Sequence, residues 1–432
     1  MTSDPHMRLR RAAEQAIDGE RILDALDVLS ATPSPHGQER ATADRMAGWA
    51  ATRWPQVGWR VDPVGPAGAN LVGSSALDER PELLIYSHLD TSLTGDPVAD
   101  EPITGSTAPI APLSRPGADG LISGFGLGVA RGAAAAALVG YAAAVTACRA
   151  TDLPHRLTLL LASAGTHRHH SGPSRRGGVE QHLDRNPLPA AAIVAKSGPP
   201  GILTEEPGAM FLRVRVGTRF HPVLARQSAL PPGGLISHLG AVVELLEAFR
   251  RRHLAARARR SDQIAAEVGI GHVQAGLASK PDLLPGVVEF HLYLVTVPGD
   301  DEARIANELR SILIDGLRDG PLEDCTVTVD GWLTHAAAAT PAHAPIARQA
   351  HAAWGAVHGQ PPASISGWRG STDGVVFRGR GVDTVRLGPS AGPDPADPRR
   401  DRCAVPDLVR FARLYAEIAL RHATASTNGG TA

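Results

Sequence analysis

The chain has 432 residues, of which 43 are Lys or Arg and 44 are Asp or Glu, so its formal net charge is −1 at pH 7. This length allows two or three domains that each bury a core, and the balanced charge argues against nucleic acid or an anionic membrane surface as a partner. Cys148, Cys325 and Cys403 lie far apart, so neither a disulfide framework nor a thiolate zinc site is expected, and a reducing cytoplasm fits.

The amino-terminal stretch predicts two helices and no targeting segment. Residues 1–11 are polar and lack the apolar run that a signal peptide needs. Residues 12–29 carry apolar side chains at helical spacing, and Pro33 and Pro35 end that helix. A second helix is expected from Gln38 to about residue 53.

A buried strand of a mainly parallel sheet is predicted for residues 83–88, which are nearly all apolar. The strand ends at His88 and Asp90, and the carboxyl ends of such strands face the ligand-binding side of an open α/β sheet. A His-x-Asp pair there is able to offer its imidazole to a metal ion while the Asp orients the ring. The alternative is a hydrogen-bonded pair that only closes the strand.

The segment after this strand carries further motifs in the order of a known family. Asp119-Gly120 precedes the glycine-rich residues 124–132, which open an Ala-rich run. With His88 and Asp90 this order resembles the M20 family of two-zinc peptidases and deacylases, and the similarity covers nearly the whole chain. The resemblance implies an α/β fold with a mainly parallel sheet in a hydrolase-like catalytic-type domain, into which an α+β lid or dimerisation domain is inserted.

The Ala-rich run itself, residues 132–148, is too short to span a bilayer. We expect a helix that packs closely on the sheet and no membrane contact.

Four of the five positions that the resemblance assigns to metal ligands carry other residues. Val129 stands in place of a bridging Asp, Thr166 or a neighbour in place of a Glu-Glu pair, Lys196 in place of an acidic ligand and Asp397 in place of a His. Only His88 is unchanged. Since a zinc site needs three or four protein ligands, we expect no zinc pair, and His88 and Asp397 are the ligands if one ion is held.

Residues 206–324 differ in character and are predicted to form the inserted lid domain. Apolar residues alternate with Arg213 and Arg215 in a strand, and helices are expected at residues 235–260 and 303–317. The resemblance implies a homodimer through this domain and places His221 as the residue that stabilises an oxyanion. The substrate-binding Asp-x-Arg of the family is absent, because Tyr293-Leu294-Val295 stands there.

The domain boundaries follow from these assignments. Residues 1–205 and 325–425 should form the discontinuous catalytic-type domain, and residues 426–432 a disordered tail. The resemblance makes Asp373, in a Gly-Ser-Thr-Asp turn, and Arg131 candidate substrate-binding residues.

Three rival motifs are weaker. The glycines of residues 124–128 fit a dinucleotide-binding pattern in neither register, since Val129 or Arg131 falls on the third glycine. Residues 388–392 read Gly-x-Ser-x-Gly, but Pro393-Asp394-Pro395 follows where a nucleophile elbow needs a helix. The cluster His167, His169 and His170 is a solvated loop or a set of substitute metal ligands.

Lys196 is the most unusual substitution, because an ammonium group repels the metal that this position should hold. We predict that it forms a salt-bridged cluster with Asp90 or Asp397, as a fixed cation in place of zinc. Lys196, His88, Asp90 and His221 are then the candidate catalytic residues.

Whether the chain is an enzyme stays open at this level. The favoured function is the binding or turnover of a small acylated amino acid or peptide-like molecule without two-zinc hydrolysis. One alternative is a mononuclear metal-dependent amidohydrolase with a rebuilt site, and the other is a non-catalytic binding protein.

Overall fold

The computed structural model describes residues 5–76, 82–166 and 177–429 and divides the chain into two compact units. Unit 1 comprises Met1–Thr204, Thr340–Ile365 and Thr372–Ala432, and unit 2 comprises Glu205–Ala339 and Ser366–Ser371. The second boundary therefore lies later than residue 325, where it was predicted. Strand β13 (Thr326–His335) pairs with β8 (Gly208–Gly217) along its length and so belongs to unit 2.

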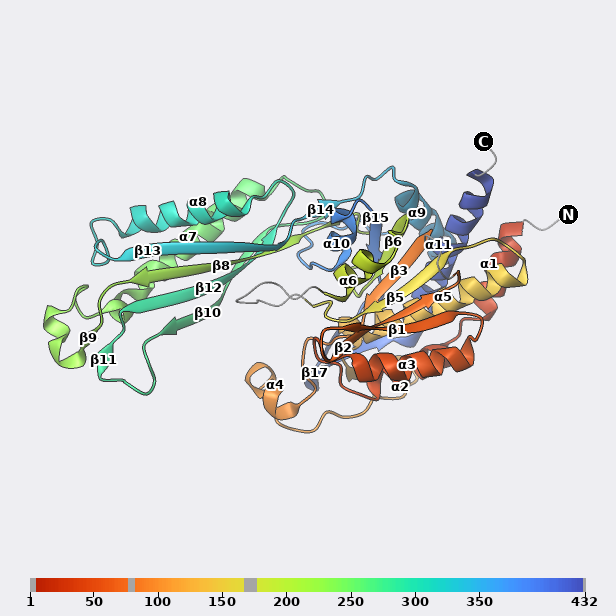
Figure 1. The fold of residues 1–432 in the computed structure, drawn as a ribbon, viewed down its shortest axis with the longest axis horizontal. Helices are drawn as coiled ribbons and strands as arrows, with labels where there is room; N and C mark the ends of the chain where they lie inside the picture. The colour runs from red at the N-terminus through yellow and green to blue at the C-terminus, as the bar shows by residue number, and fades with distance from the viewer. Residues whose placement is uncertain (1–4, 77–81, 167–176, 430–432) are drawn as a thin grey trace. The chain divides into compact units, whose positions relative to one another are not determined.

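The described residues of unit 1 form a six-stranded, mainly parallel sheet in the order β1-β2-β5-β3-β6-β15 (Figure 1). Strand β2 is antiparallel to both of its neighbours, while β5, β3, β6 and β15 run parallel. The bounds of these strands are β1 (Gly58–Val64), β2 (Gly68–Ser74), β3 (Leu83–His88), β5 (Leu157–Ala162), β6 (Ala191–Ala195) and β15 (Asp383–Leu387). The mixed α/β fold with a largely parallel central sheet agrees with the prediction.

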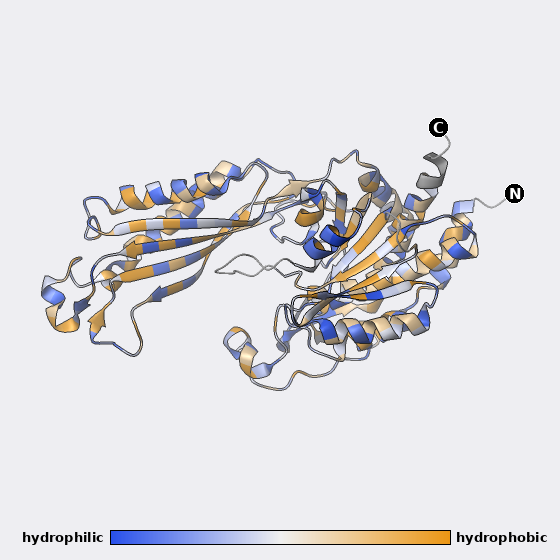
Figure 2. Cartoon of the chain, in the orientation of Figure 1, coloured by the Kyte–Doolittle hydropathy of each residue, from blue (hydrophilic) through white to orange (hydrophobic). Residues whose placement is uncertain are grey.

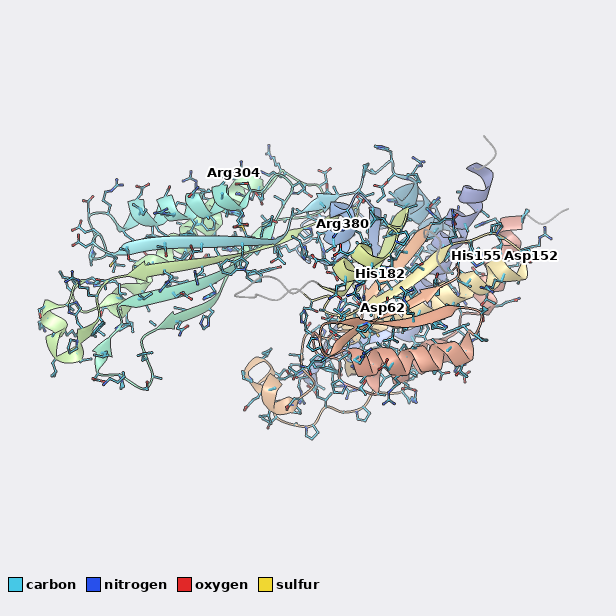
Figure 3. All side chains as sticks on the ribbon, viewed as in Figure 1. Asp62, Asp152, His155, His182, Arg304 and Arg380 are labelled. Atoms are coloured by element: carbon cyan, nitrogen blue, oxygen red, sulfur yellow. The ribbon has the colours of Figure 1, made fainter. Side chains whose placement is uncertain are left out.

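Helices cover both faces of this sheet, which explains why its central strands are apolar throughout. One face packs in a core with the long helices α5 and α11, and the other in a smaller core with α6 and α10. An ion pair of 2.7 Å between Arg380 and Asp184 links the ends of α10 and α6, and Figure 3 labels Arg380 and the buried His182 of α6. The helices of unit 1 are α1 (Pro5–Gln15), α2 (Gly19–Ser30), α3 (Arg40–Arg53), α4 (Pro97–Thr104), α5 (Gly132–Ala150), α6 (Gly178–Arg185), α9 (Pro345–His358), α10 (Gly374–Gly379) and α11 (Val405–Gly429).

The single amino-terminal helix predicted for residues 12–29 is two helices, α1 and α2. Asp18 separates them, because its side chain accepts a hydrogen bond of 2.8 Å from the Arg21 amide and caps α2. At the carboxyl end, α11 continues to Gly429, so the backbone of residues 426–429 is helical and does not form the disordered tail predicted from residue 426. Residues 430–432 lie outside the described residues.

The Ala-rich run forms α5 and packs on the sheet, as predicted. The segment Leu127–Ala150 is long and apolar enough to cross a bilayer, but 83% of its most apolar window is buried inside the protein. It is therefore a core helix. Its first turn, Leu127–Arg131, follows β4 (Leu121–Phe125), which pairs with β17 (Asp397–Ala404) and, through it, with β16 (Gly392–Asp394).

Unit 2 contains a four-stranded antiparallel sheet in the order β10-β12-β8-β13. Its strands alternate between apolar and polar residues (Figure 2), because one face packs against two helices and the other faces solvent. The remaining elements are β10 (Glu267–Ala275), β12 (Val287–Thr296), α7 (Leu239–Arg257), α8 (Glu302–Leu317), and the short strands β7 (Glu205–Glu206), β9 (His221–Pro222), β11 (Leu283–Leu284) and β14 (Ala338–Ala339).

Candidate functional site

The imidazole of His88 lies at the carboxyl end of β3 and is buried. Its Nδ1 is 3.0 Å from the Asp90 carboxylate and 3.0 Å from the Asp90 carbonyl oxygen. Its Nε2 is also buried but has no hydrogen-bond partner among the described residues. A buried polar atom without a partner is costly in an apolar interior, so Nε2 is the atom of this site that a ligand would engage.

Asp90 is held in turn by the chain that follows β5. The Gly165 amide donates to one carboxylate oxygen at 2.7 Å, and the Thr166 amide to the other at 3.0 Å. Burial alone would raise the pKa of Asp90, but His88 and these hydrogen bonds hold it well below its usual range. Asp90 therefore stays ionised and keeps the Nδ1 proton of His88 in place.

Burial lowers the pKa of His88, and the positive charge of Lys196 lowers it further, while Asp90 acts in the opposite direction. The ring is therefore neutral near pH 7. A neutral imidazole with Nδ1–H directed at Asp90 leaves the Nε2 lone pair as a proton or ligand acceptor.

Lys196 follows β6, which pairs in parallel with β3 so that Tyr86 lies opposite Val194. Two residues further along both strands, His88 and Lys196 fall on neighbouring strand ends and on the same face of the sheet. The charge of Lys196 acts on both His88 and Asp373. Lys196 thus lies in the electrostatic surroundings of His88, and its predicted role as a fixed cation in place of zinc stays a prediction.

Asp397, one of the two carboxylates expected beside Lys196, has another partner. Its carboxylate pairs with the Arg399 guanidinium at 3.0 Å and also accepts the Arg399 amide at 3.0 Å. The β17 hairpin thus engages Asp397 locally, and the predicted cluster of Lys196 with Asp397 is wrong. The clustering of Lys196 with Asp90 stays a prediction.

Asp373 instead lies close to the site, just before α10, and is almost fully buried. The Tyr86 hydroxyl donates a hydrogen bond of 2.5 Å to its carboxylate. Burial raises the pKa of Asp373 to about 7, against the opposing effects of Tyr86 and Lys196. We call His88, Asp90, Tyr86, Lys196 and Asp373 the strand-end site.

Arg131, the other candidate for substrate binding, has a structural role. Its guanidinium is buried, donates to the carbonyl oxygens of Thr32 at 2.8 Å and Phe125 at 3.1 Å, and lies 5.1 Å from the centre of the Phe125 ring. These contacts join the start of α5 to the loop after α2. They leave the guanidinium directed at backbone and not at a ligand.

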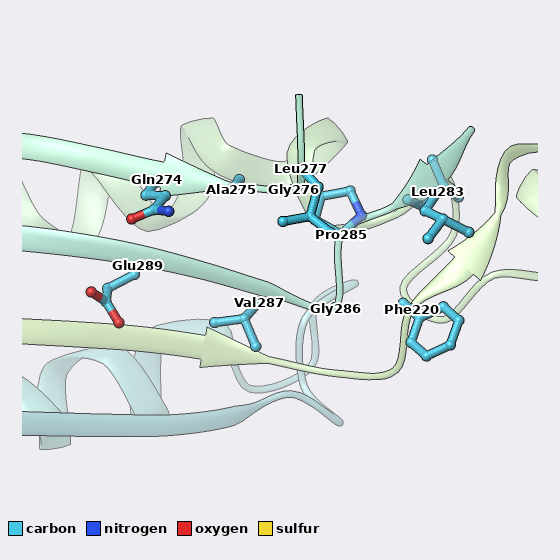
Figure 4. Close-up of a pocket in the computed structure, with 11 residues that line it drawn as sticks. Phe220, Gln274, Ala275, Gly276, Leu277, Leu283, Pro285, Gly286, Val287 and Glu289 are labelled. Atoms are coloured by element: carbon cyan, nitrogen blue, oxygen red, sulfur yellow. The ribbon is translucent and has the colours of Figure 1, made fainter. Parts of the chain in front are cut away.

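His221 lies in β9 of unit 2, opposite Leu284 of β11. The residue before it, Phe220, lines an apolar groove of about 490 Å³ (Figure 4). The groove is bounded by the turn before β12, with Pro285 and Val287, and by the end of β10. His221 thus belongs to a different unit from the strand-end site.

The rival motifs fit local structure. Residues 124–128 pass from β4 into the π-helical turn Leu127–Arg131 that precedes α5, where the Gly128 amide donates to Asp401 at 2.9 Å. Residues 388–392 lead into β16, so no helix follows Ser390 as an elbow would need. The cluster His167, His169 and His170 lies outside the described residues.

The residues at the strand-end site do not fit a zinc pair. Val129 supplies no donor atom, Lys196 adds a positive charge next to His88, and Asp373 already binds Tyr86. Across residues 5–76, 82–166 and 177–429, no three His, Cys, Asp or Glu side chains are grouped to hold a metal ion. The buried Nε2 of His88, with its carboxylate partner on Nδ1, is an arrangement typical of a metal-binding His.

Sequence reasoning missed two residues of this region. Tyr86 precedes His88 by two positions in the strand and so shares its face, a signal that the alternation of a strand contains. Glu39, fully buried, holds the turn after β5 through the Ala164 amide at 3.0 Å. Nothing in the local pattern around Glu39 indicates that contact, which spans 125 positions of sequence.

Comparison with solved structures identifies the fold. A tripeptidase from Staphylococcus aureus superposes with a TM-score of 0.67 at 15% identity, covering 94% of this chain and 99% of that one. An M20 family metallo-carboxypeptidase from Sulfolobus solfataricus superposes with a TM-score of 0.65 at 13% identity, covering 94% and 99%. The chain has the M20 peptidase fold.

A dinuclear metal-binding peptidase of the M20 family from Bacillus subtilis shares this M20 fold, with a TM-score of 0.58 at 13% identity over 94% of this chain and 98% of that one. No protein-family profile matches the sequence, and no curated protein matches it either. The backbone is thus shared with metal-dependent enzymes whose sequences have diverged far from this one.

Proposed function

We propose that the protein binds a small acylated amino acid or peptide-like molecule at the strand-end site and acts on its amide bond without a zinc pair. The observation that carries this proposal is the buried, partnerless Nε2 of His88, held by Asp90 on a fold shared with peptidases. Such an atom needs a ligand or a water molecule as a partner.

The chemistry proposed for the site is general-base catalysis by His88. Its neutral ring accepts a proton at Nε2 from a water molecule as the water oxygen bonds to the carbonyl carbon of the amide. Asp90 stabilises the charged ring that results, and the ammonium of Lys196 favours negative charge on the carbonyl oxygen. When the C–N bond breaks, the same proton passes from Nε2 to the leaving nitrogen, so that water and amide give an acid and an amine.

The second candidate is a mononuclear metal-dependent amidohydrolase. It is favoured by the same Nε2 atom, because a metal-bound His commonly directs its other nitrogen to a carboxylate, as His88 does to Asp90. When bound, an ion would polarise a carbonyl group or a water molecule. Asp397 is not free to be its second ligand without breaking its contacts to Arg399.

One experiment separates these functions. The purified protein is stripped with a chelator, divided into metal-free and zinc-loaded samples, and screened against N-acyl amino acids and dipeptides for turnover and for binding. Elemental analysis gives the metal content. We expect binding that needs His88, at most one ion per chain, and turnover that survives stripping.

A His88→Gln variant serves as the control, because glutamine is close in size but lacks the basic Nε2. Turnover lost on stripping and restored by one zinc ion per chain would favour the mononuclear enzyme. Ligand binding without turnover in either sample would leave a non-catalytic binding protein. Two tightly bound zinc ions per chain would refute the proposal.

A further inference from the structure

We propose that Glu39 is a positioning residue for His88 and acts through the turn of residues 163–166. The use of His88 as a base rests on the proposed function, but the positioning itself can be tested without any substrate. Glu39 stands at the start of α3, and its side chain is completely buried. A carboxylate in such a place must be satisfied by hydrogen bonds.

The partners of Glu39 converge on the turn after β5. Its Oε1 accepts from the amide of Gly37 at 2.7 Å and from the amide of Ala164 at 3.0 Å, while Oε2 accepts from the hydroxyl of Ser163. Two of these three donors belong to the turn. The Glu39 side chain makes no capping hydrogen bond to α3, so it is committed to the turn and to Gly37.

The turn has a shape that needs such anchors. Ala164 adopts a φ of 55°, in the left-handed region that residues with a Cβ atom seldom occupy. Asn70 adds one more anchor, because its side-chain oxygen accepts from the Ser163 amide at 2.9 Å. With the backbone in this form, the next two amides, those of Gly165 and Thr166, both reach Asp90.

A continuous series of hydrogen bonds therefore runs from Glu39 to the turn, from the turn to Asp90, and from Asp90 to Nδ1 of His88. If the turn relaxes, the Asp90 carboxylate loses the two amide donors that fix its position, and it no longer stays aligned on Nδ1 of His88. The His88 ring is then free to place its proton on either nitrogen. Glu39 therefore acts by holding the turn in position and not through its charge, because its hydrogen-bond donors are backbone amides and a hydroxyl.

The test compares Glu39→Ala with Glu39→Gln by NMR of protein labelled with ¹⁵N-histidine, the His88 signals being assigned by their absence in His88→Gln. In the unaltered protein we expect one tautomer with the proton on Nδ1. E39A should show mixed tautomers, with part of the His88 population carrying its proton on Nε2. E39Q should restore the single tautomer, since its amide oxygen accepts the two backbone amides and its NH₂ donates to the Ser163 hydroxyl.

Leu26→Ala is the matched control, because Leu26 is buried in the core of unit 1 and belongs to neither the turn nor the site. It should lower stability and leave the His88 tautomer unchanged. An unaltered His88 spectrum in E39A, or the same change in L26A, would overturn the proposal. If E39A does not fold, E39D takes its place, since its shorter side chain falls short of the turn, and a single Nδ1–H tautomer in folded E39D would likewise refute it.

The NMR readout keeps this inference separate from the proposed function. A protein without turnover but with tautomer changes in E39A would retain the positioning role and lose the catalytic one. If the wild-type protein shows turnover but the His88 tautomer is unchanged in E39A, the catalytic role is retained and the positioning role of Glu39 is lost.

Discussion

At the scale of single residues, the strand-end site is held together by hydrogen bonds between buried groups. Asp90 and Asp373 are both buried near His88, but their pKa values shift in opposite directions. Asp90 stays ionised because amides and His88 stabilise its charge, whereas burial raises the pKa of Asp373 to about 7. The charge of Lys196 acts on His88 and on Asp373.

Gly165 limits the space around His88. A Cβ atom on Gly165 would lie 2.6 Å from the Cβ of His88 and 2.9 Å from the Tyr86 hydroxyl. We expect Gly165→Ala to displace the imidazole, to cost about 1–3 kcal/mol of stability, and to weaken ligand binding at least tenfold. Isothermal titration and urea unfolding measure the two effects.

Gly48→Ala is the control for this variant. Gly48 lies in α3 with nothing within 4 Å of its added Cβ, so this change should stabilise the helix by about 0.5–1 kcal/mol and leave binding unaltered. If G165A bound the ligand with wild-type affinity, then either binding would tolerate the displaced His88 or His88 would not contact the ligand.

Asp373 predicts a pH dependence of stability. Its pKa is about 7 in the folded protein, compared with an ordinary value of 3.8, so the folded state holds a proton that the unfolded state has lost between these pH values. This group therefore makes the protein less stable as the pH rises from 4 to above 7. Asp373→Asn removes the effect and should gain stability relative to wild type at pH 8, with a smaller difference at pH 5. Urea unfolding at the two pH values checks this, and a constant difference would contradict it.

At the scale of elements, the contact of α5 with α11 dominates unit 1. Small residues along α5 let the two backbones approach closely at Gly140. A Cβ atom on Gly140 would lie 2.4 Å from the carbonyl oxygen of Ala412. The Ala-rich composition of α5 is thus a requirement of packing, in addition to its high helix propensity.

Gly140→Ala should therefore destabilise the protein by about 1–3 kcal/mol, although the same change in an open helix is favourable. Gly355→Ala in α9 supplies the comparison, because an added Cβ meets nothing within 4 Å there and should stabilise by about 0.5–1 kcal/mol. Chemical denaturation followed by circular dichroism measures both. If both substitutions changed the free energy of unfolding equally, α5 and α11 would be able to move apart at little cost in stability.

At the scale of the whole molecule, each unit buries its own core, one around the parallel sheet and one between the antiparallel sheet and α7 and α8. The edge strand β10 pairs only with β12 among the described strands. Val273 on β10 and Leu277 just after it are 53% and 65% exposed. An exposed edge strand with apolar side chains is a surface on which another chain can pair.

We propose that unit 2 forms a homodimer through this edge. Val273→Arg should then give a monomer in light-scattering measurements, because a buried interface does not tolerate an unpaired charge. Val98→Arg, at a 70% exposed position of α4 in unit 1, is the control and should not alter the mass. A wild-type protein that is monomeric at high concentration would disprove the dimer.

The sequence by itself determined the mixed α/β fold class, the apolar strand that ends at His88, the core helix α5 and the half-solvated sheet of unit 2. These features depend on the local periodicity of side chains, which a single chain displays directly. The proposal that Val129 and Lys196 stand at metal-ligand positions also comes from the sequence, because it needs only the order of the motifs.

Only the tertiary structure decided which polar groups meet. Tyr86 and Asp373 are 287 positions apart and Glu39 and Ala164 are 125 apart, so no local pattern contains either contact. For the same reason the sequence could not show that Arg131 binds backbone carbonyls or that β13 belongs to unit 2. Asp397 was misplaced because its partner Arg399, two residues away, satisfies it before any distant cation does. A buried polar group takes whichever partners folding brings within reach, and that choice depends on the packing of the whole unit.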